Sequence, residues 1–373
     1  MMRIALLILI VIHGIIHLFG FFKAFGISEF NAITHSISKS YGVVWLLVFF
    51  LFGLTVILNL IQSDYWWLSG FLAVILSQLL IINYWSNAKF GTLVNLIILM
   101  AVLIGYSSFS FRQKIQEERI HMFANTLTQN REVVTEQALR DLPAIVQKWM
   151  RANGILGKEV ITNVHLTQEV QLKMKPEQST WNPGTAKQYF TIHPPAFHWA
   201  INTEMNSILS VVGRDQFKEG KGEMLIKLWS LIPVADAKHE EKVNQATLQR
   251  FLAEIVWFPT AALSPYLTWE RIDDHSARAV MDYKGTKGSG VFHFNKDGGF
   301  EKFVAMRFQN SSDSKPTQWT VKATKTEIRN GILIPVECEA SWKLENGEWT
   351  WLKLKIRDIQ YDVKDMPEAV KEQ

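Results

Sequence analysis

Four long runs of apolar residues occupy most of the first 111 positions of the chain, and no charged side chain interrupts them. They cover residues 4–22, 41–63, 65–88 and 90–111. A helix needs about 20 apolar residues to cross the hydrocarbon core of a bilayer. Helices also satisfy their own backbone hydrogen bonds in lipid. The pattern therefore predicts a domain of four transmembrane helices at residues 1–111.

A more polar segment follows at residues 112–156. Its first part, RQKIQEERIHMFANTL, is expected to continue the fourth helix and to end near Gln129 and Asn130. Apolar side chains recur at helical spacing over residues 135–152, which predicts a second helix that Pro143 breaks or kinks. We interpret this segment as a juxtamembrane helical linker.

From Gly157 onward the apolar period changes from 3.6 residues to 2. The clearest case is residues 332–344, where every even position is apolar. Such alternation predicts a strand with one buried face. In residues 348–363 the apolar parity changes twice, which indicates a bulge at each change. The same reading predicts the other strands at 164–175, 187–192, 197–203, 207–212, 222–229, 268–273, 277–284, 289–295, 300–308 and 318–328.

About a dozen consecutive strands with one polar face predict a large antiparallel sheet. The fold class expected is therefore α+β: a four-helix transmembrane bundle followed by a curved antiparallel sheet, open or a half barrel, with covering helices. The β-rich soluble domain is placed at residues 157–373. One strong helix is expected inside the strand series, at residues 243–257, and it is the obvious cover for the apolar face of the sheet.

That helix has two different faces. One is an apolar stripe at spacing i, i+3, i+4 and i+7, made of Leu248, Phe251, Leu252 and Ile255. The other carries Arg250, Glu254 and Trp257, with Arg before Glu, which is the weaker order for a simple helical pair. Arg214, Asp215 or Asp273 are therefore possible partners. The alternative is a solvated surface ion pair. The candidate ligand-binding residues are Arg214, Asp215, Arg250, Glu254, Trp257 and Trp269.

Histidines give two further candidate sites. His13 and His17 lie one helical turn apart in the first apolar run and are weak candidates for a metal or haem site. The alternative is hydrogen bonding to amide side chains of other helices. His193 and His198 flank a double proline, and acid–base or metal chemistry there would need carboxylates brought close by folding, such as Asp215 or Glu254.

Charge and composition narrow the function classes. Of 39 Lys and Arg and 35 Asp and Glu, only four and two precede Arg112, so the rest of the chain is close to neutral. Nucleic acid is not an expected partner, because binding it needs a concentrated basic face. Cys338 is the single cysteine, which excludes an intrachain disulfide. No nucleotide, hydrolase or metalloprotease motif occurs, and no cofactor is expected. Gly285–Gly290 reads as a hairpin turn.

Basic residues near the ends of the apolar runs leave the orientation open. Arg3, Arg112, Lys114 and Arg119 would lie on one side, and Lys23, Lys39 and Lys89 on the other. The positive-inside rule favours a cytoplasmic soluble domain by a single charge. We expect a multi-pass protein of the cell (inner) membrane and leave the side of its soluble domain unresolved.

Several sequence segments resemble one bacterial family that is known only as a domain of unknown function. They are TWNPGTAKQYFTIHPPAFHWA, GRDQFKEGKGEM and LQRFLAEIVWFPTAALSPYLTWERIDDHSARA. HGIIHLFGFFKAF and WSNAKFGTLVNLIIL are similar to the membrane part of its longer members. The soluble part more loosely resembles the half-barrel fold of lipoprotein carriers. That resemblance implies a curved sheet closed by helices over an apolar cavity, and a place outside the cytoplasm.

These observations favour a membrane-tethered, non-enzymatic module that binds a lipid or other amphipathic ligand in a cavity between sheet and helix. Its partners would be the lipid bilayer and that small molecule. One alternative is a membrane-bound metal- or haem-dependent enzyme that uses His13 and His17 or His193 and His198. Another is an envelope scaffold or signalling anchor without a small ligand.

Overall fold

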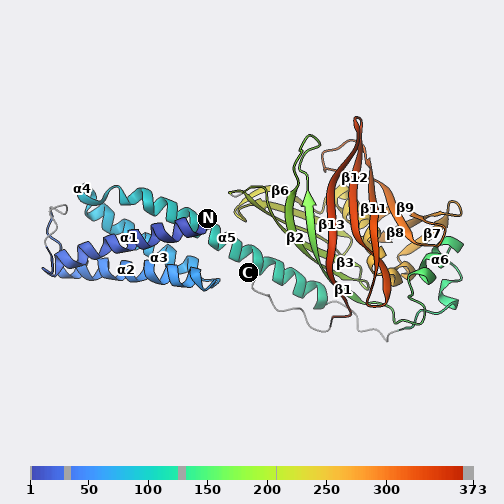
Figure 1. Ribbon diagram of the computed structural model, residues 1–373, viewed down its shortest axis with the longest axis horizontal. Coiled ribbons are helices and arrows are strands. Elements are labelled where there is room, and N and C mark those ends of the chain that lie inside the picture. The colour runs from blue at the N-terminus through green and yellow to red at the C-terminus, as the bar shows by residue number, and fades with distance from the viewer. Residues whose placement is uncertain (1, 29–34, 125–131, 207, 364–373) are drawn as a thin grey trace. The chain divides into compact units, whose positions relative to one another are not determined.

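The chain is described by a computed structural model over residues 2–28, 35–124, 132–206 and 208–363 (Figure 1). It forms two compact units. The first extends to Gln113. The second begins at Lys114, so the long helix α5 contributes to both.

The first unit consists of helices. Within the described ranges, four of them are long and apolar enough to cross a membrane, as predicted. The third predicted run divides at Tyr84 into a long and a short helix. The helices are α1 (Met2–Ala24), α2 (Lys39–Leu60), α3 (Trp66–Asn83), the short α4 (Trp85–Ala88) and α5 (Gly91–Ala124).

The linker is helical only in parts. Helix α5 continues through polar residues to Ala124, as expected, while its predicted end near Gln129 and Asn130 lies outside the described residues. In place of one helix over residues 135–152, the chain forms a 3-10 turn, η1 (Gln137–Leu139), and α6 (Ala144–Ala152). Pro143 directly precedes α6, because proline fits the start of a helix but not its interior.

A single antiparallel sheet makes up most of the second unit, and it has 13 strands in the part of the chain described. The predicted fold class is confirmed. The strands are β1 (Asn163–Leu172), β2 (Asn182–Thr191), β3 (Ala196–Glu204), β4 (Ser210–Lys218), β5 (Lys221–Leu228), β6 (Ile232–Lys238), β7 (Leu267–Arg271), β8 (Ser276–Tyr283), β9 (Thr286–Phe294), β10 (Phe300–Arg307), β11 (Thr317–Arg329), β12 (Ile332–Leu344) and β13 (Gly347–Tyr361).

The strand order is a meander interrupted once. It runs β6-β5-β4-β3-β2-β1-β13-β12-β11-β10-β9-β8-β7, so β1 and β13 are the only neighbours that are not consecutive in the described chain. The register of β13 shifts near Ile356 against β1 and near Leu352 against β12. These are the two places where the apolar parity changes, so the expected irregularities are present.

Strand β6 is absent from the strands predicted from the sequence. It is the edge strand beside β5, and its side chains are exposed or half-buried. An edge strand with little burial has no apolar alternation to reveal it.

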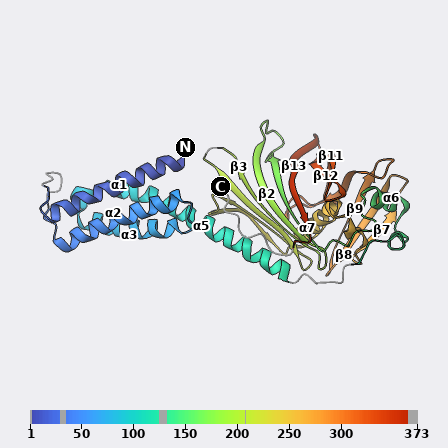
Figure 2. The same cartoon turned by 60° about the horizontal axis from the view of Figure 1, so that its bottom comes forward.

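The two edges of the sheet are joined by helical segments that lie against one face of the sheet (Figure 2). We call this the inner face. Helix α7 (Glu241–Glu254) starts two residues before the predicted helix, and the 3-10 turns η2 (Ile255–Trp257) and η3 (Pro259–Leu263) follow it. Its predicted apolar stripe, Leu248, Phe251, Leu252 and Ile255, is fully buried.

The sheet curls around α7 until the strands near its two edges meet. We call these two groups of strands the wings: β4–β6 at one edge and β7–β10 at the other. The hydroxyl group of Thr286, at the start of β9, donates to the carbonyl of Gly220 in the β4–β5 turn at 2.6 Å. Lys284 and Glu219 form an ion pair between the same turns. These segments lie near opposite edges of the sheet, so the contact shows how far the sheet bends.

Two glycines on the inner face bring α7 close to both wings. A Cβ atom at Gly222 of β5 would lie 2.1 Å from the Thr247 hydroxyl oxygen and 2.7 Å from the Val243 carbonyl oxygen. One at Gly288 of β9 would lie 2.8 Å from a methyl group of Leu248. Only glycine leaves room for the helix to approach the strands this closely.

Candidate functional site

A cluster of charged side chains lies on the inner face beside α7. Arg250 donates to Glu254 one turn later at 2.9 Å and to Asp215 of β4 at 2.7 Å. All three side chains are 11 to 21% exposed. Asp215, one of the three possible partners considered from the sequence, therefore does bind Arg250. The pair is not the solvated surface ion pair of the alternative reading.

Hydrogen bonds extend this cluster along the sheet. The amide of Gln188 on β2 donates to Glu254 at 2.8 Å. The amide of Gln168 on β1 donates to Gln188 at 3.3 Å, and the indole N–H of Trp199 on β3 donates to Gln168 at 2.9 Å. The Arg250 guanidinium also lies 4.5 Å from the Trp199 ring centroid. The charged groups are thus held in place by neighbours from three strands.

Arg307, at the end of β10, is the member of this region that the sequence reading missed. Its Nε donates to the carbonyl of Ala246 on α7 at 3.0 Å. Its guanidinium carbon lies 4.6 Å from the ring centroid of Trp319 on β11 and 5.8 Å from that of Trp342 on β12. A signal was available: Phe303, Ala305 and Arg307 alternate along one strand, which places an arginine on the apolar side.

Burial changes the proton affinity of these groups. It raises the pKa of both Asp215 and Glu254, although Arg250 opposes that change. Burial acts to lower the pKa of Arg250, but the charges of Glu254 and Asp215 outweigh it and raise that pKa. Burial, with the charge of Arg250, lowers the pKa of Arg307 to about 10. Both arginines therefore stay cationic at neutral pH.

An apolar strip adjoins the charges on the inner face of β11, β12 and β13. Its side chains pack against the buried core but are themselves only half-buried. Trp349 pairs with Trp342 across the two strands, so the strip is continuous with the aromatic rings beside Arg307. We call these residues the inner strip: Val321, Ala323, Leu344, Trp349, Leu352 and Leu354.

Arg214 belongs to a different site, although it precedes Asp215. Successive residues of a strand point to opposite faces. Arg214 is fully buried on the outer face, where it forms ion pairs with Glu118 of α5 at 3.1 Å and Glu223 of β5 at 2.9 Å. The structure therefore separates two neighbouring candidates into two networks.

His198 completes this outer cluster. Its Nε2 lies 3.1 Å from the Glu118 carboxylate, and its ring is 1% exposed. Burial lowers the pKa of His198 to about 4, so the ring is neutral and donates to the carboxylate. His193 is elsewhere, 5.8 Å from the Tyr266 ring by centroids. The structure does not bring the two histidines to one site.

Of the two tryptophan candidates, Trp257 lies in the core and Trp269 is half-buried against it. Trp257 is 2% exposed and donates to the carbonyl of Pro335 at 3.0 Å. Trp269 packs against Trp149 and donates to the carbonyl of Ala262 at 3.0 Å. Within the described ranges, no hydrogen bond or cation–π contact links either of them to Arg250, Asp215 or Glu254.

His13 and His17 lie inside the first unit and form a polar network there. His13 Nε2 is 2.9 Å from the side-chain oxygen of Asn95, and His17 Nε2 is 3.0 Å from the hydroxyl of Ser77. All four side chains are buried. Among the described residues no group of three or more His, Cys, Asp or Glu is arranged to hold a metal ion. The geometry is that of hydrogen bonding between helices.

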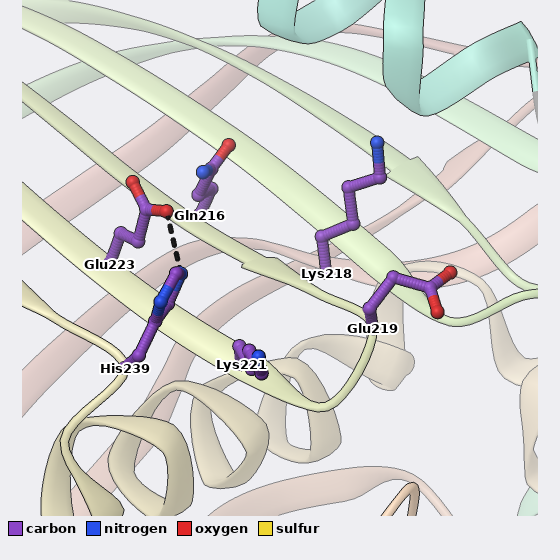
Figure 3. A pocket seen from close by; sticks show the side chains of 6 residues that line it. All are labelled: Gln216, Lys218, Glu219, Lys221, Glu223 and His239. Carbon is purple, nitrogen blue, oxygen red and sulfur yellow. Dashed lines mark hydrogen bonds and ion pairs between the residues drawn. The ribbon is translucent and has the colours of Figure 1, made fainter.

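Two polar pockets open on the surface of the second unit. One, of about 180 Å³, is lined by Glu223 and His239, which are 3.0 Å apart, and by Gln216, Lys218, Glu219 and Lys221 (Figure 3). The other, of about 300 Å³, is lined in part by Asp273, whose carboxylate accepts from the backbone N–H of His275, while Arg250 donates to Asp215 and Glu254. Neither pocket includes a residue of the inner strip.

Comparison with known proteins places the chain in a family. Residues 140–361 match the family described as "Family of unknown function (DUF6920)". The chain belongs to this family. The resemblance noted in the sequence is thereby confirmed. No protein with a curated description matches the chain.

Solved structures are also similar to parts of the chain, at low sequence identity and low TM-score. A DUF1329 family protein from Desulfovibrio piger is 10% identical, with 61% of this chain and 95% of that one covered and a TM-score of 0.36. A LolA superfamily protein from Nitrosomonas europaea is 11% identical, with 64% and 98% covered and a TM-score of 0.30. A beta-barrel-like DUF1849 protein from Brucella abortus is 11% identical, with 54% and 99% covered and a TM-score of 0.21.

Proposed function

We propose that this protein is a membrane-anchored, non-enzymatic module that binds an amphipathic molecule, such as a lipid, on the inner face of its sheet. The anchor would be the four long apolar helices. The ligand would come from the adjacent bilayer. The inner strip would take its apolar part, and the neighbouring charges would take its polar part.

The observation that carries this proposal is the half-buried inner strip beside charged groups. Leu352 and Leu354 of β13 and Val321 of β11 turn toward the inner face, yet they keep part of their surface exposed. A contiguous apolar surface that a fold leaves uncovered is typical of a binding site. A ligand chain on this surface would remove it from water.

The ligand would lie beside α7 and not beneath it. The stripe from Leu248 to Ile255 fills the space between helix and sheet, because each of its side chains is fully buried. The cavity expected there from the sequence is replaced by packed core. The proposal therefore moves the apolar contact from the helix interface to the strands next to it.

Photo-crosslinking in membranes tests this proposal. A phospholipid with a diazirine in its acyl chain should label peptides of β11–β13, and Leu352→Glu should reduce that labelling several-fold. Lys353→Glu is a matched control, because Lys353 lies on the outer face beside Glu339. Labelling confined to residues 1–111, with none on the sheet, would contradict a sheet-bound ligand.

A further inference from the structure

We infer that Arg307 is the recognition residue for an oxyanion headgroup, so that the ligand is an amphipathic molecule ending in a carboxylate or a phosphate. This inference rests on the proposed function and gives its ligand a chemical class. The two arginines of the inner face differ in the partners that they bind.

Arg250 already binds two carboxylates of the protein itself. Its Nε and Nη1 groups donate to Glu254 and Asp215, two carboxylates that hold the guanidinium from both sides. A ligand could reach those N–H groups only by displacing a buried ion pair. Arg250 therefore positions the cluster and leaves recognition to another group.

Arg307 has the opposite arrangement. Its Nε is used by the carbonyl of Ala246, and within the described ranges the guanidinium forms no ion pair with a carboxylate. Its two terminal nitrogens donate no hydrogen bond within those ranges, and neither is fully buried, so both keep some surface that solvent can reach. Trp319 and Trp342 lie against the guanidinium, which leaves its N–H edge for a planar acceptor.

The chemistry of that edge selects an oxyanion. A guanidinium presents paired N–H donors that match the two oxygens of a carboxylate or phosphate, and its plane stacks on aromatic rings. The raised proton affinity of nearby Asp215 and Glu254 would allow one proton to offset the added negative charge. Arg214 faces the other side of the sheet and would not compete.

The position of Arg307 also suits an amphipathic ligand. Trp319 touches Arg307, Trp342 is paired with Trp319 in the sheet, and Trp349 is paired with Trp342. The next inner-face residues of β13 are Leu352 and Leu354. A headgroup on Arg307 would therefore leave its chain along the inner strip.

The test uses the full chain in phosphatidylcholine nanodiscs and two photoreactive probes. One is a long-chain fatty acid with a diazirine, and the other is the corresponding alcohol. The wild-type chain should reach half-saturation of β11–β13 labelling at about tenfold or more lower concentration of the acid than of the alcohol. Arg307→Gln should weaken the acid by roughly 10- to 100-fold and leave the alcohol unchanged.

Two further variants sharpen the result. Arg278→Gln makes the same change on the outer face of β8, where Arg278 is half exposed near Glu270, and should change neither probe. Arg307→Lys keeps the charge but loses the paired donors, so acid binding should be intermediate. Competition by unlabelled fatty acid or by lysophosphatidic acid then identifies carboxylate or phosphate as the preferred head.

Each outcome separates the inference from the proposal beneath it. Equal half-saturation for acid and alcohol in the wild-type chain would overturn the oxyanion headgroup while the binding module stands. Equal loss of both probes in Arg307→Gln would assign Arg307 a structural role only. Failure of every probe to label the sheet would overturn both. The wild-type comparison needs no variant, so a folding defect in Arg307→Gln cannot mask the answer.

Discussion

Charged residues of the second unit are buried in two separate networks, one on each face of the sheet. Arg214 and Asp215 are consecutive, but the alternation of a strand sends one to Glu118 and Glu223 and the other to Arg250. A buried charge is stable only with a compensating partner. Each network therefore acts as a unit. Removal of one charged member leaves its partners buried without a compensating charge.

Arg214→Gln tests the outer network. Glu118 and Glu223 would remain in a poorly solvated place without their cation, and the expected loss in the free energy of unfolding is about 3–5 kcal/mol. Chemical denaturation of the purified chain, followed by fluorescence, measures it. In the double variant Arg214→Gln, Glu118→Gln part of the loss should return. A loss no larger than that of Arg278→Gln would show that the ion pairs contribute little.

His198 should make the stability of the folded chain depend on pH. Burial lowers the pKa of His198 to about 4 in the folded chain, against 6.5 in the unfolded chain. Between these values the unfolded chain binds a proton that the folded chain does not, so stability should fall as pH falls from 6.5 to 4. The slope is at most about 1.4 kcal/mol per pH unit.

His198→Gln is the matching variant, because glutamine can still donate to Glu118 but does not titrate. The wild-type chain should lose stability relative to this variant over that pH window. Asp215 and Glu254, whose pKa values are raised by burial, contribute in the opposite direction in both proteins and cancel in the comparison. Parallel pH profiles, measured by hydrogen exchange of the β3 amides, would contradict a neutral His198.

At the scale of elements, α7 is held by shape and by hydrogen bonds to both wings. Asn244 accepts from the backbone N–H of Gly222 at 2.7 Å, and Gln249 donates to the carbonyls of Ser289 and Met306 at 3.1 and 2.9 Å. The helix therefore joins strands that lie far apart in the sheet. Its position also fixes Arg250 and the carbonyl that binds Arg307.

Gly222→Ala should displace α7 from the β5 wing. The added methyl group would overlap the Thr247 hydroxyl and the Val243 carbonyl, and overpacking of this kind costs about 1–3 kcal/mol of stability. Thr247→Ala in the same chain should relieve the side-chain part of the overlap and recover some of the loss. A melting temperature unchanged by Gly222→Ala would mean that the helix is not packed this closely.

At the scale of the whole molecule, contact between the wings is the feature that makes the second unit a curled sheet. The pair Glu219→Cys and Lys284→Cys places thiols on two turns that already touch through an ion pair. Mild oxidation should therefore crosslink them, which peptide mass spectrometry would detect. The native Cys338 is 2% exposed and should not interfere. Persistent free thiols at both positions would contradict closure of the wings.

The sequence predicted the helices and strands better than it predicted the contacts between their side chains. Uncharged runs revealed the long helices, strict alternation revealed β12, and an apolar stripe revealed α7, because each of these patterns is local. Strand β6 escaped because an exposed edge carries no alternation. The role of Arg307 was not predicted because it depends on Trp319, Trp342 and Ala246, which only folding brings together.

The side chain of Trp257 was placed on the wrong face. In the helical pattern it shares a face with Arg250, but the change to a 3-10 turn at Ile255 directs it into the core.

The pairing of β1 with β13 has a consequence for biosynthesis. Val164 lies opposite Tyr361, so the first strand of the sheet to leave the ribosome waits for the last one. Until β13 is synthesised, β1 presents an unpaired edge, and such edges invite pairing with other chains. Helix α5 precedes β1 and packs Met122 against Tyr189 of β2, the strand next to β1. A nascent chain can therefore shelter its early strands on a helix made before them, and the final strand converts two half-sheets into one.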